Sequence, residues 1–276
     1  MINQFHKLSR PLLSLAALVT TGIAAAADVT VFSTDFEGPS VPAEFTALAP
    51  SDLTPVQDYA GLGTKGYRFA GKFYRHQTAT IVTLTLTNLP PHTELDIEFL
   101  FAAIDSLDGT GLFPQGDYFR VTLDGTQIFR ASFANALPYP QQIQSYVSAP
   151  GVELARRIDL GFNGPGSYFT DSAYDMSREP RFKNLPHTAS TATFTFRIEG
   201  DGIQDIWDES WAFDNVRVIA RSPGNPADLD GDGSVGAADL SILLAAWGAT
   251  GSNPADLDGD GSVGASDLSI LLVSWG

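Results

Sequence analysis

The feature that most constrains this chain is an internal repeat near its C-terminus. The segment Asn-Pro-Ala-Asp-Leu-Asp-Gly-Asp-Gly-Ser-Val-Gly-Ala begins at Asn225 and again, 28 residues later, at Asn253. One residue after each copy the chain reads Asp-Leu-Ser-Ile-Leu-Leu. Duplication of so short a unit predicts two equivalent structural elements that bury their apolar sides against each other.

Each copy places its aspartates at positions 1, 3, 5 and 12 of a loop, which is the spacing of the EF-hand calcium loop. Calcium takes six to eight oxygen ligands at about 2.3–2.6 Å, and alternate residues of a tightly turning loop direct their oxygens at one centre. Gly at position 6 permits the sharp turn, and Ser at position 7 is expected to give its backbone carbonyl. The predicted ligands are Asp228, Asp230, Asp232, Ser234 and Asp239 in the first loop and Asp256, Asp258, Asp260, Ser262 and Asp267 in the second. We therefore expect two calcium ions in the tail, the alternative being a solvated acidic turn.

A short helix is predicted to begin at position 10 of each loop. Apolar residues recur there at i, i+3, i+4 and i+7, which favours an amphipathic helix. The two stripes, expected to be buried against each other, are Leu240, Leu243, Leu244 and Trp247, and Leu268, Leu271, Leu272 and Trp275.

A calcium loop followed by one helix, duplicated at this period, resembles the type I dockerin family over residues 225–276. The resemblance implies a small helical domain of tandem EF-hand-like loop–helix units that folds on calcium and binds a cohesin module, which docks the rest of the chain onto a scaffold or cell surface. Dockerins often have a Ser/Thr pair at loop positions 10 and 11, where this chain has Ala237, Ala238, Ala265 and Ser266, and neither helix contains Lys or Arg. A purely structural calcium clamp, similar to thrombospondin-like Asp-rich repeats, therefore stays open as the alternative.

The N-terminus predicts export. Lys7 and Arg10 precede an apolar run that ends in four alanines before Asp28, so residues 1–27 are interpreted as a signal peptide and the protein as secreted, extracellular or attached to the cell surface. No later run is apolar enough to span a bilayer. With no Cys for disulfides, stability must come from core burial and metal ions.

The charge of the chain is strongly negative. The formal net charge is −16, and residues 222–276 contain eight Asp and no Glu, Lys or Arg. Nucleic acid and anionic membranes are therefore excluded as expected partners, whereas cations are favoured. We expect the acidic tail, residues 222–276, to form a domain separate from residues 28–221.

Residues 28–221 are expected to form an all-β sandwich of the jelly-roll type. Runs of β-branched and aromatic residues alternate with turn clusters, and no long amphipathic helix precedes Ala237. Asn88–Pro91 and Asp124-Gly125 are interpreted as hairpin turns, and long loops are expected over 106–116 and 161–187. The predicted strands are 78–89, 94–103, 118–123, 127–133, 191–200 and 212–220.

The two ends of this domain, Thr34–Gly38 and Asp208–Val218, resemble segments of carbohydrate-binding and MAM-like jelly rolls. The resemblance implies that Glu37 and Asp214 meet on adjacent strands and hold one further calcium ion; the alternative is that both are simple strand-edge carboxylates. The family resemblances also imply a setting of polysaccharide breakdown. Sugar rings stack on exposed aromatic faces, so aromatic residues of the domain suggest polysaccharide as a ligand. The candidate rings are Phe113, Tyr139, Tyr146, Tyr168, Phe169, Tyr174, Trp207 and Trp211.

An enzyme is the competing hypothesis. Glu94-Leu-Asp-Ile-Glu-Phe99 resembles the catalytic strand of laminarinase- and lichenase-like retaining glycosidases, which implies Glu94 as nucleophile, Glu98 as acid/base and Asp96 between them. Strand alternation places these three acids on one face, but a solvated outer face gives the same pattern. We expect a binding module with no catalytic residues, and retain the glycosidase as the alternative.

Overall fold

The computed structural model describes residues 28–48, 51–110, 116–135, 143–162, 170–222 and 224–276. The described chain divides into two compact units, one extending to residue 222 and the other starting at residue 224. The predicted signal peptide, residues 1–27, lies outside the described residues. In the part of the chain that is described, no helix is long and apolar enough to cross a bilayer.

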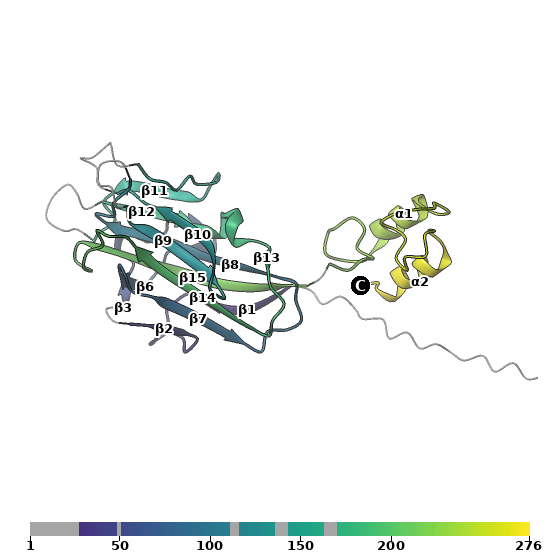
Figure 1. Cartoon of the computed structure of the whole chain (residues 1–276), viewed down its shortest axis with the longest axis horizontal. Coiled ribbons are helices and arrows are strands. Elements are labelled where there is room, and N and C mark those ends of the chain that lie inside the picture. The colour runs from purple at the N-terminus through teal and green to yellow at the C-terminus, as the bar shows by residue number, and fades with distance from the viewer. Residues whose placement is uncertain (1–27, 49–50, 111–115, 136–142, 163–169, 223) are drawn as a thin grey trace, which may run out of the picture. The chain divides into compact units, whose positions relative to one another are not determined.

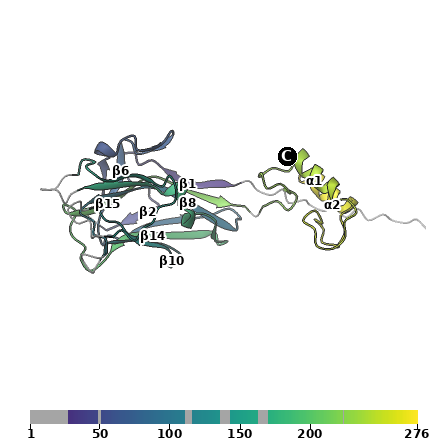
Figure 2. The same ribbon diagram turned by 90° about the horizontal axis from the view of Figure 1, so that it is seen from above.

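The first unit is a β-sandwich, seen face-on in Figure 1 and as two layers in Figure 2. One sheet has the strand order β11-β12-β8-β15-β6-β3, with β1 also paired to β15 and β13 to β8, and the facing sheet has the order β10-β9-β14-β7-β2. The strands are β1 Val29–Thr34, β2 Phe45–Ala47, β3 Ser51–Pro55, β4 Gly63–Thr64, β5 Tyr67–Arg68, β6 Lys72–Gln77, β7 Val82–Thr87, β8 Glu94–Asp105, β9 Tyr118–Leu123, β10 Thr126–Ser132, β11 Glu153–Ile158, β12 Asp171–Asp175, β13 Leu185–Pro186, β14 Thr191–Glu199 and β15 Glu209–Arg221. The predicted fold class, a jelly-roll sandwich followed by a small helical domain, is confirmed.

Each of the six predicted strands has a counterpart, but one predicted turn is wrong. Asp124-Gly125 does connect the paired strands β9 and β10. Asn88–Pro91 is not a hairpin turn, because β7 pairs with β14 and β2 while β8 lies in the other sheet. This segment is a crossover between the layers.

The segment expected to be a long loop over 161–187 contains regular structure. Strand β12 pairs with β8 and β11, and two short 3-10 helices follow it at Met176–Arg178 and Pro180–Phe182. All five residues of β12 are buried, so its sequence Asp-Ser-Ala-Tyr-Asp lacks the alternation by which a half-exposed strand is recognised.

Aromatic side chains from both sheets fill the space between the layers. Phe99 of β8 lies 5.8 Å, centroid to centroid, from Phe196 of β14, and Trp211 of β15 lies 5.3 Å from Phe119 of β9. Phe196 and Phe213 are separated by 5.3 Å. Rings at these distances add edge-to-face attraction to the burial of apolar area, so the two sheets are held together without a disulfide.

A second apolar cluster covers part of the opposite face of the larger sheet. Leu100, Ala102 and Ile104 of β8 pack there beneath Tyr59 and other residues of 56–73 and 160–162. Consequently β8 is buried on both faces over most of its length.

The second unit consists of two loop–helix repeats. Helix α1 is Ala237–Ala245 and helix α2 is Ala265–Val273. Its apolar core is small and symmetric, with three equivalent residues from each repeat: Ala227, Val235, Leu243, Ala255, Val263 and Leu271.

Candidate functional site

The two Asp-rich loops of the tail have almost the same internal hydrogen bonds. The N–H of Gly233 donates to Oδ2 of Asp228 at 2.9 Å, and the N–H of Gly261 donates to Oδ2 of Asp256 at 2.9 Å. These glycines have φ values of +92° and +89°, a left-handed conformation in which a Cβ would be strained. Position 6 of each loop therefore turns the chain back around the first aspartate.

The aspartate at position 12 closes each loop from the first turn of its helix. Burial raises the pKa of Asp239, but the backbone N–H groups of Gly236, Asp230 and Leu229 outweigh that effect and hold the pKa below its usual range. For Asp267 the N–H of Gly264 is the largest contribution, and the pKa is again lowered. Both side chains are thus fixed as carboxylates that face the loop.

Carboxylate oxygens gather at one point in each loop. Oxygens of Asp228, Asp230 and Asp239 lie within 4.8 Å of one another, as do those of Asp256, Asp258 and Asp267. The N–H of Asp232 lowers the pKa of Asp230, but desolvation and the charges of Asp232, Asp239 and Asp228 raise it further, so the net shift is upward. Three acids held this close repel one another unless a cation lies between them.

The position-5 and position-7 residues surround these groups. Oδ1 of Asp232 accepts the N–H of Ser234 at 2.9 Å, and Oδ1 of Asp260 accepts the N–H of Ser262 at 2.8 Å. Neither Asp232 nor Asp260 belongs to the groups of three, so the structure brings six of the eight predicted aspartate ligands together.

The predicted burial of the helix stripes is only partly correct. Leu243 and Leu271 are fully buried, whereas Leu244 and Leu272 are 52% and 53% exposed. Trp247 and Trp275 follow the helix ends and are about half exposed. Leu240 and Leu268 are partly buried against the same core. The contact between the two nine-residue helices therefore covers the first half of each stripe, and the leucine and tryptophan that end it remain about half exposed.

In the sandwich, the structure brings Glu37 and Asp214 to one place, together with Asp35, which the sequence interpretation missed. The pKa of Asp214 is raised to about 8, mainly by burial. The charges of Glu37 and Asp35 contribute to this rise, and two backbone N–H groups oppose it. Gly71 lies directly against the Glu37 carboxylate, which accepts the N–H of Lys72 at 2.9 Å. Glu37 and Asp214 are not among the groups of three oxygens within 4.8 Å found in the described residues. Asp35 stands two residues from Glu37, an alternation that could have indicated it.

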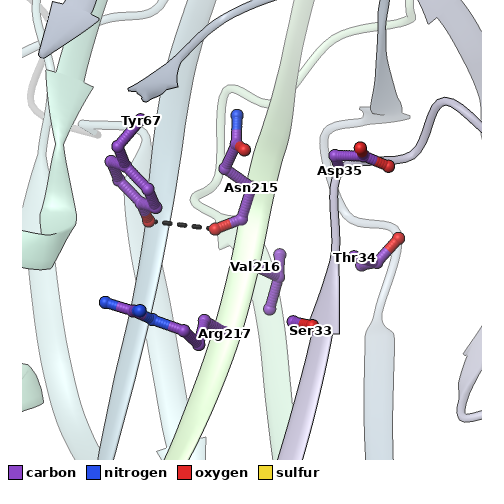
Figure 3. Close-up of a pocket in the computed structure, with 7 residues that line it drawn as sticks. All are labelled: Ser33, Thr34, Asp35, Tyr67, Asn215, Val216 and Arg217. Atoms are coloured by element: carbon purple, nitrogen blue, oxygen red, sulfur yellow. Dashed lines mark hydrogen bonds between the residues drawn. The ribbon is translucent and has the colours of Figure 1, made fainter. Parts of the chain in front are cut away.

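Two hollows, which share Asp35 and Asn215 in their linings, lie beside these acids. One, of about 230 Å³, is lined by Asp35, Glu37, Gly66, Arg68, Ala70, Asp214 and Asn215, and the other, of about 280 Å³, is shown in Figure 3. There the Tyr67 hydroxyl donates to the carbonyl of Asn215 at 2.9 Å. Asn215 has a φ of +51° and lies where the register between β15 and β8 shifts, so a bulge in β15 shapes both hollows.

The acids of β8 lie in a network of ion pairs. Glu98 is buried and accepts from the Lys183 ammonium and, at 2.7 Å, from Nε of Arg217. Asp96 is fully buried and accepts from Arg221 and the N–H of Asn184. An acid/base carboxyl must exchange a proton with the leaving group, whereas both oxygens of Glu98 already accept charge-assisted bonds. The arrangement thus does not favour the glycosidase alternative at Glu94 and Glu98.

Among the candidate sugar-stacking rings that lie in the described residues, Trp207 is the exposed one. Trp207 is 79% exposed, whereas Tyr146, Tyr174 and Trp211 are buried in the core. Phe113, Tyr139, Tyr168 and Phe169 lie outside the described residues.

Comparison with known proteins identifies the second unit. Residues 226–272 match the family model of the dockerin type I domain. The C-terminal unit is therefore a type I dockerin domain, as its two loop–helix repeats indicate, and it is a calcium-binding domain. No curated protein matches the chain.

Solved structures align with the chain at low similarity. They include the Agl-KA catalytic domain, at 13% identity over 83% of this chain and 36% of that chain with a TM-score of 0.32. Another is the CBM22-1–GH10 portion of Clostridium thermocellum xylanase 10B in complex with xylohexaose, at 10% identity over 80% and 36% with a TM-score of 0.26. A third is the GH115 4-O-methyl-α-glucuronidase BtGH115A, at 11% identity over 78% and 19% with a TM-score of 0.27. The chain thus spans about a third or less of these proteins, and likeness at this level carries no argument about its function.

Proposed function

We propose that this chain is a secreted docking protein, in which the dockerin domain attaches a carbohydrate-interacting sandwich to a cohesin-like or cell-surface partner. The observation that carries the proposal is the duplicated loop–helix unit matched by the dockerin type I model. Dockerin domains bind cohesins, and the setting is accordingly polysaccharide breakdown.

The exposed apolar side chains of the tail fit a docking role. Each repeat leaves the same kinds of residue on its surface: Ile242, Leu244 and Trp247 in the first, and Ile270, Leu272 and Trp275 in the second. A domain that served only as a calcium clamp would not need to expose these two matching sets of apolar side chains. We expect the partner to bind through apolar contacts, because neither helix has a basic residue. The exposed residues Ala237, Ala238, Ala265 and Ser266 are expected to take part in the contact.

In this proposal the tail holds two calcium ions, one in each loop. Asp228, Asp230, Asp232 and Asp239 supply side-chain oxygens and Ser234 a backbone carbonyl, and Asp256, Asp258, Asp260, Asp267 and Ser262 do the same in the second loop. A third ion is proposed between Glu37 and Asp214 in the sandwich, where mutual repulsion of the acids favours a cation.

The docking proposal is tested by partner binding of the full-length chain. A panel of cohesin modules is immobilised, and binding of the wild type is compared with that of a chain carrying Leu244→Ala and Leu272→Ala, which leave the calcium loops intact. Binding to at least one cohesin in calcium, with loss of at least tenfold in affinity for the double variant, supports docking. Calcium-dependent folding with no cohesin bound would favour the structural clamp.

A saccharide contact through the sandwich is the second part of the proposal, and it is supported by the exposed indole of Trp207. Sugar rings stack on exposed aromatic faces. Pull-down on insoluble polysaccharides, together with an assay for soluble products, separates a binding module from the glycosidase alternative. Product release that is lost in Glu94→Gln would favour the enzyme.

A further inference from the structure

A third group of acids lies in the sandwich, away from Glu37 and Asp214. Asp108 follows β8, Asp117 precedes β9, and Glu209 begins β15. Oxygens of the three carboxylates lie within 4.8 Å of one another, although the residues are far apart in the sequence. The site is therefore a product of the tertiary fold.

The backbone holds these segments together. The N–H of Asp117 donates to the carbonyl of Asp108 at 2.8 Å, and the N–H of Asp108 donates to Oδ2 of Asp117. Glu209 accepts the N–H and the side-chain amide of Gln204 at 3.0 and 3.3 Å. The positions of the three acids are thus fixed by bonds other than those among the carboxylates.

One oxygen of the group has no partner. Asp117 is 1% exposed, its Oδ2 is bound by Asp108, and its Oδ1 is a buried acceptor without a hydrogen bond. Glu209 is fully buried, and no ion pair found among the described residues includes Asp117 or Glu209. A buried carboxylate oxygen with neither donor nor cation is costly, and native structures rarely leave one.

We propose that Asp108, Asp117 and Glu209 bind a hard divalent cation, calcium in an extracellular setting, with the free Oδ1 of Asp117 as one of its ligands. Carboxylate oxygens are the ligands of hard cations. Two oxygens bound to one calcium ion at about 2.4 Å lie at most about 4.8 Å apart, which is the limit within which these three groups fall.

The electrostatics of the site agree with a cation. Burial raises the pKa of Asp117 to about 7, and the charge of Asp108 adds to the shift, while burial and the charge of Asp117 raise the pKa of Glu209 to about 9. A divalent ion would relieve both desolvation and repulsion. Asp108 is only half-buried, so it offers a path by which an ion can reach the site.

Occupancy would anchor the turn that carries Trp207. The N–H of Glu209 donates to the carbonyl of Asp205 at 2.8 Å, and the N–H of Trp207 to Oδ1 of Asp205 at 2.9 Å. Ser106, two residues before Asp108, donates through its N–H and its hydroxyl to the carbonyl of Asp208 at 3.1 and 3.0 Å. An ion held by Glu209 and Asp108 would therefore fasten this turn to the end of β8.

The test counts bound calcium in the full-length chain. The parent chain and its variants are dialysed against CaCl₂, and the number of calcium ions bound per chain is measured. Because the tail is the same in all of them, the difference between a variant and the parent reports the sandwich alone. The Asp117→Asn variant is expected to bind one calcium ion fewer than the parent. The Glu209→Gln variant is expected to lose the same ion. Glu37→Gln is the matched control: the loss caused by Asp117→Asn should persist in its background, because the two groups of acids are separate.

Unchanged calcium in a folded Asp117→Asn variant would overturn the proposal and leave a proton shared between Asp117 and Glu209 as the occupant. If neither variant folds, the unfolding midpoint of the sandwich is measured with and without calcium in the full-length chain carrying Asp228→Ala, Asp256→Ala and Glu37→Gln. A rise with calcium supports the site. A midpoint that calcium does not move rejects it.

Discussion

Removal of calcium from the full-length chain is expected to unfold the dockerin domain while the sandwich stays folded. The tail has no disulfide, and its core consists of two leucines, two valines and two alanines. A single core in a domain below about 70–80 residues rarely supplies more than about 3–5 kcal/mol. Calcium at one hundred times its dissociation constant adds about 2.7 kcal/mol per site, so two sites contribute about 5 kcal/mol, as much as the whole margin of such a core.

Scanning calorimetry of the full-length chain provides the assay. In the presence of calcium we expect two unfolding transitions, one for the tail and one for the sandwich. In EDTA the transition of the tail should disappear, and that of the sandwich should persist at a lower midpoint. The half-exposed Trp247 and Trp275 of the tail add a fluorescence change to that of Trp207 and Trp211 in the sandwich, and the change caused by EDTA should come from the tail. Asp228→Ala and Asp256→Ala should lower the tail midpoint by similar amounts, since the two loops share their hydrogen bonds. Two transitions that EDTA leaves unchanged would refute the reasoning.

Three further predictions concern the sandwich. Asp96→Asn should cost about 1–3 kcal/mol in urea unfolding, because it removes the fully buried carboxylate that pairs with Arg221 and Lys183 and leaves them only Asp28 and Glu98 as counter-charges. Both cations are partly exposed, which lowers the cost. An unchanged unfolding midpoint would contradict the ion-pair account. Burial and the charge of Asp171 raise the pKa of Asp105 to about 8, so the folded state keeps a proton that the unfolded chain releases above about pH 4. Stability should therefore fall from about pH 4 to pH 8 by up to about 1.4 kcal/mol per pH unit from this group, and Asp105→Asn should flatten that slope in pH-dependent urea melts. Trp207→Ala should weaken polysaccharide pull-down without moving the unfolding midpoint, since the indole is exposed; undiminished pull-down would exclude it as a sugar platform.

The dockerin repeat could be predicted in detail because its chemistry is local. Twelve consecutive residues contain the turn glycine and all predicted ligands of one ion, so spacing alone indicates where oxygens converge. The extent of helix burial could not be predicted, because Leu243 and Leu244 have the same chemistry and only the neighbouring helix decides which of them is covered.

In the sandwich the sequence determined the fold class and six of the fifteen strands of the described residues, since alternation and turn residues act over a few positions. Only the tertiary structure decided which strands pair across the layers, why Glu98 is bound by Arg217 and Lys183, and why Asp35 lies with Glu37 and Asp214. It also decided that Asp108, Asp117 and Glu209, each unremarkable in its own segment, meet at one point. The physical reason is that spacing fixes contacts within one turn or strand, whereas contacts between distant segments follow from which apolar faces the sheets bury together.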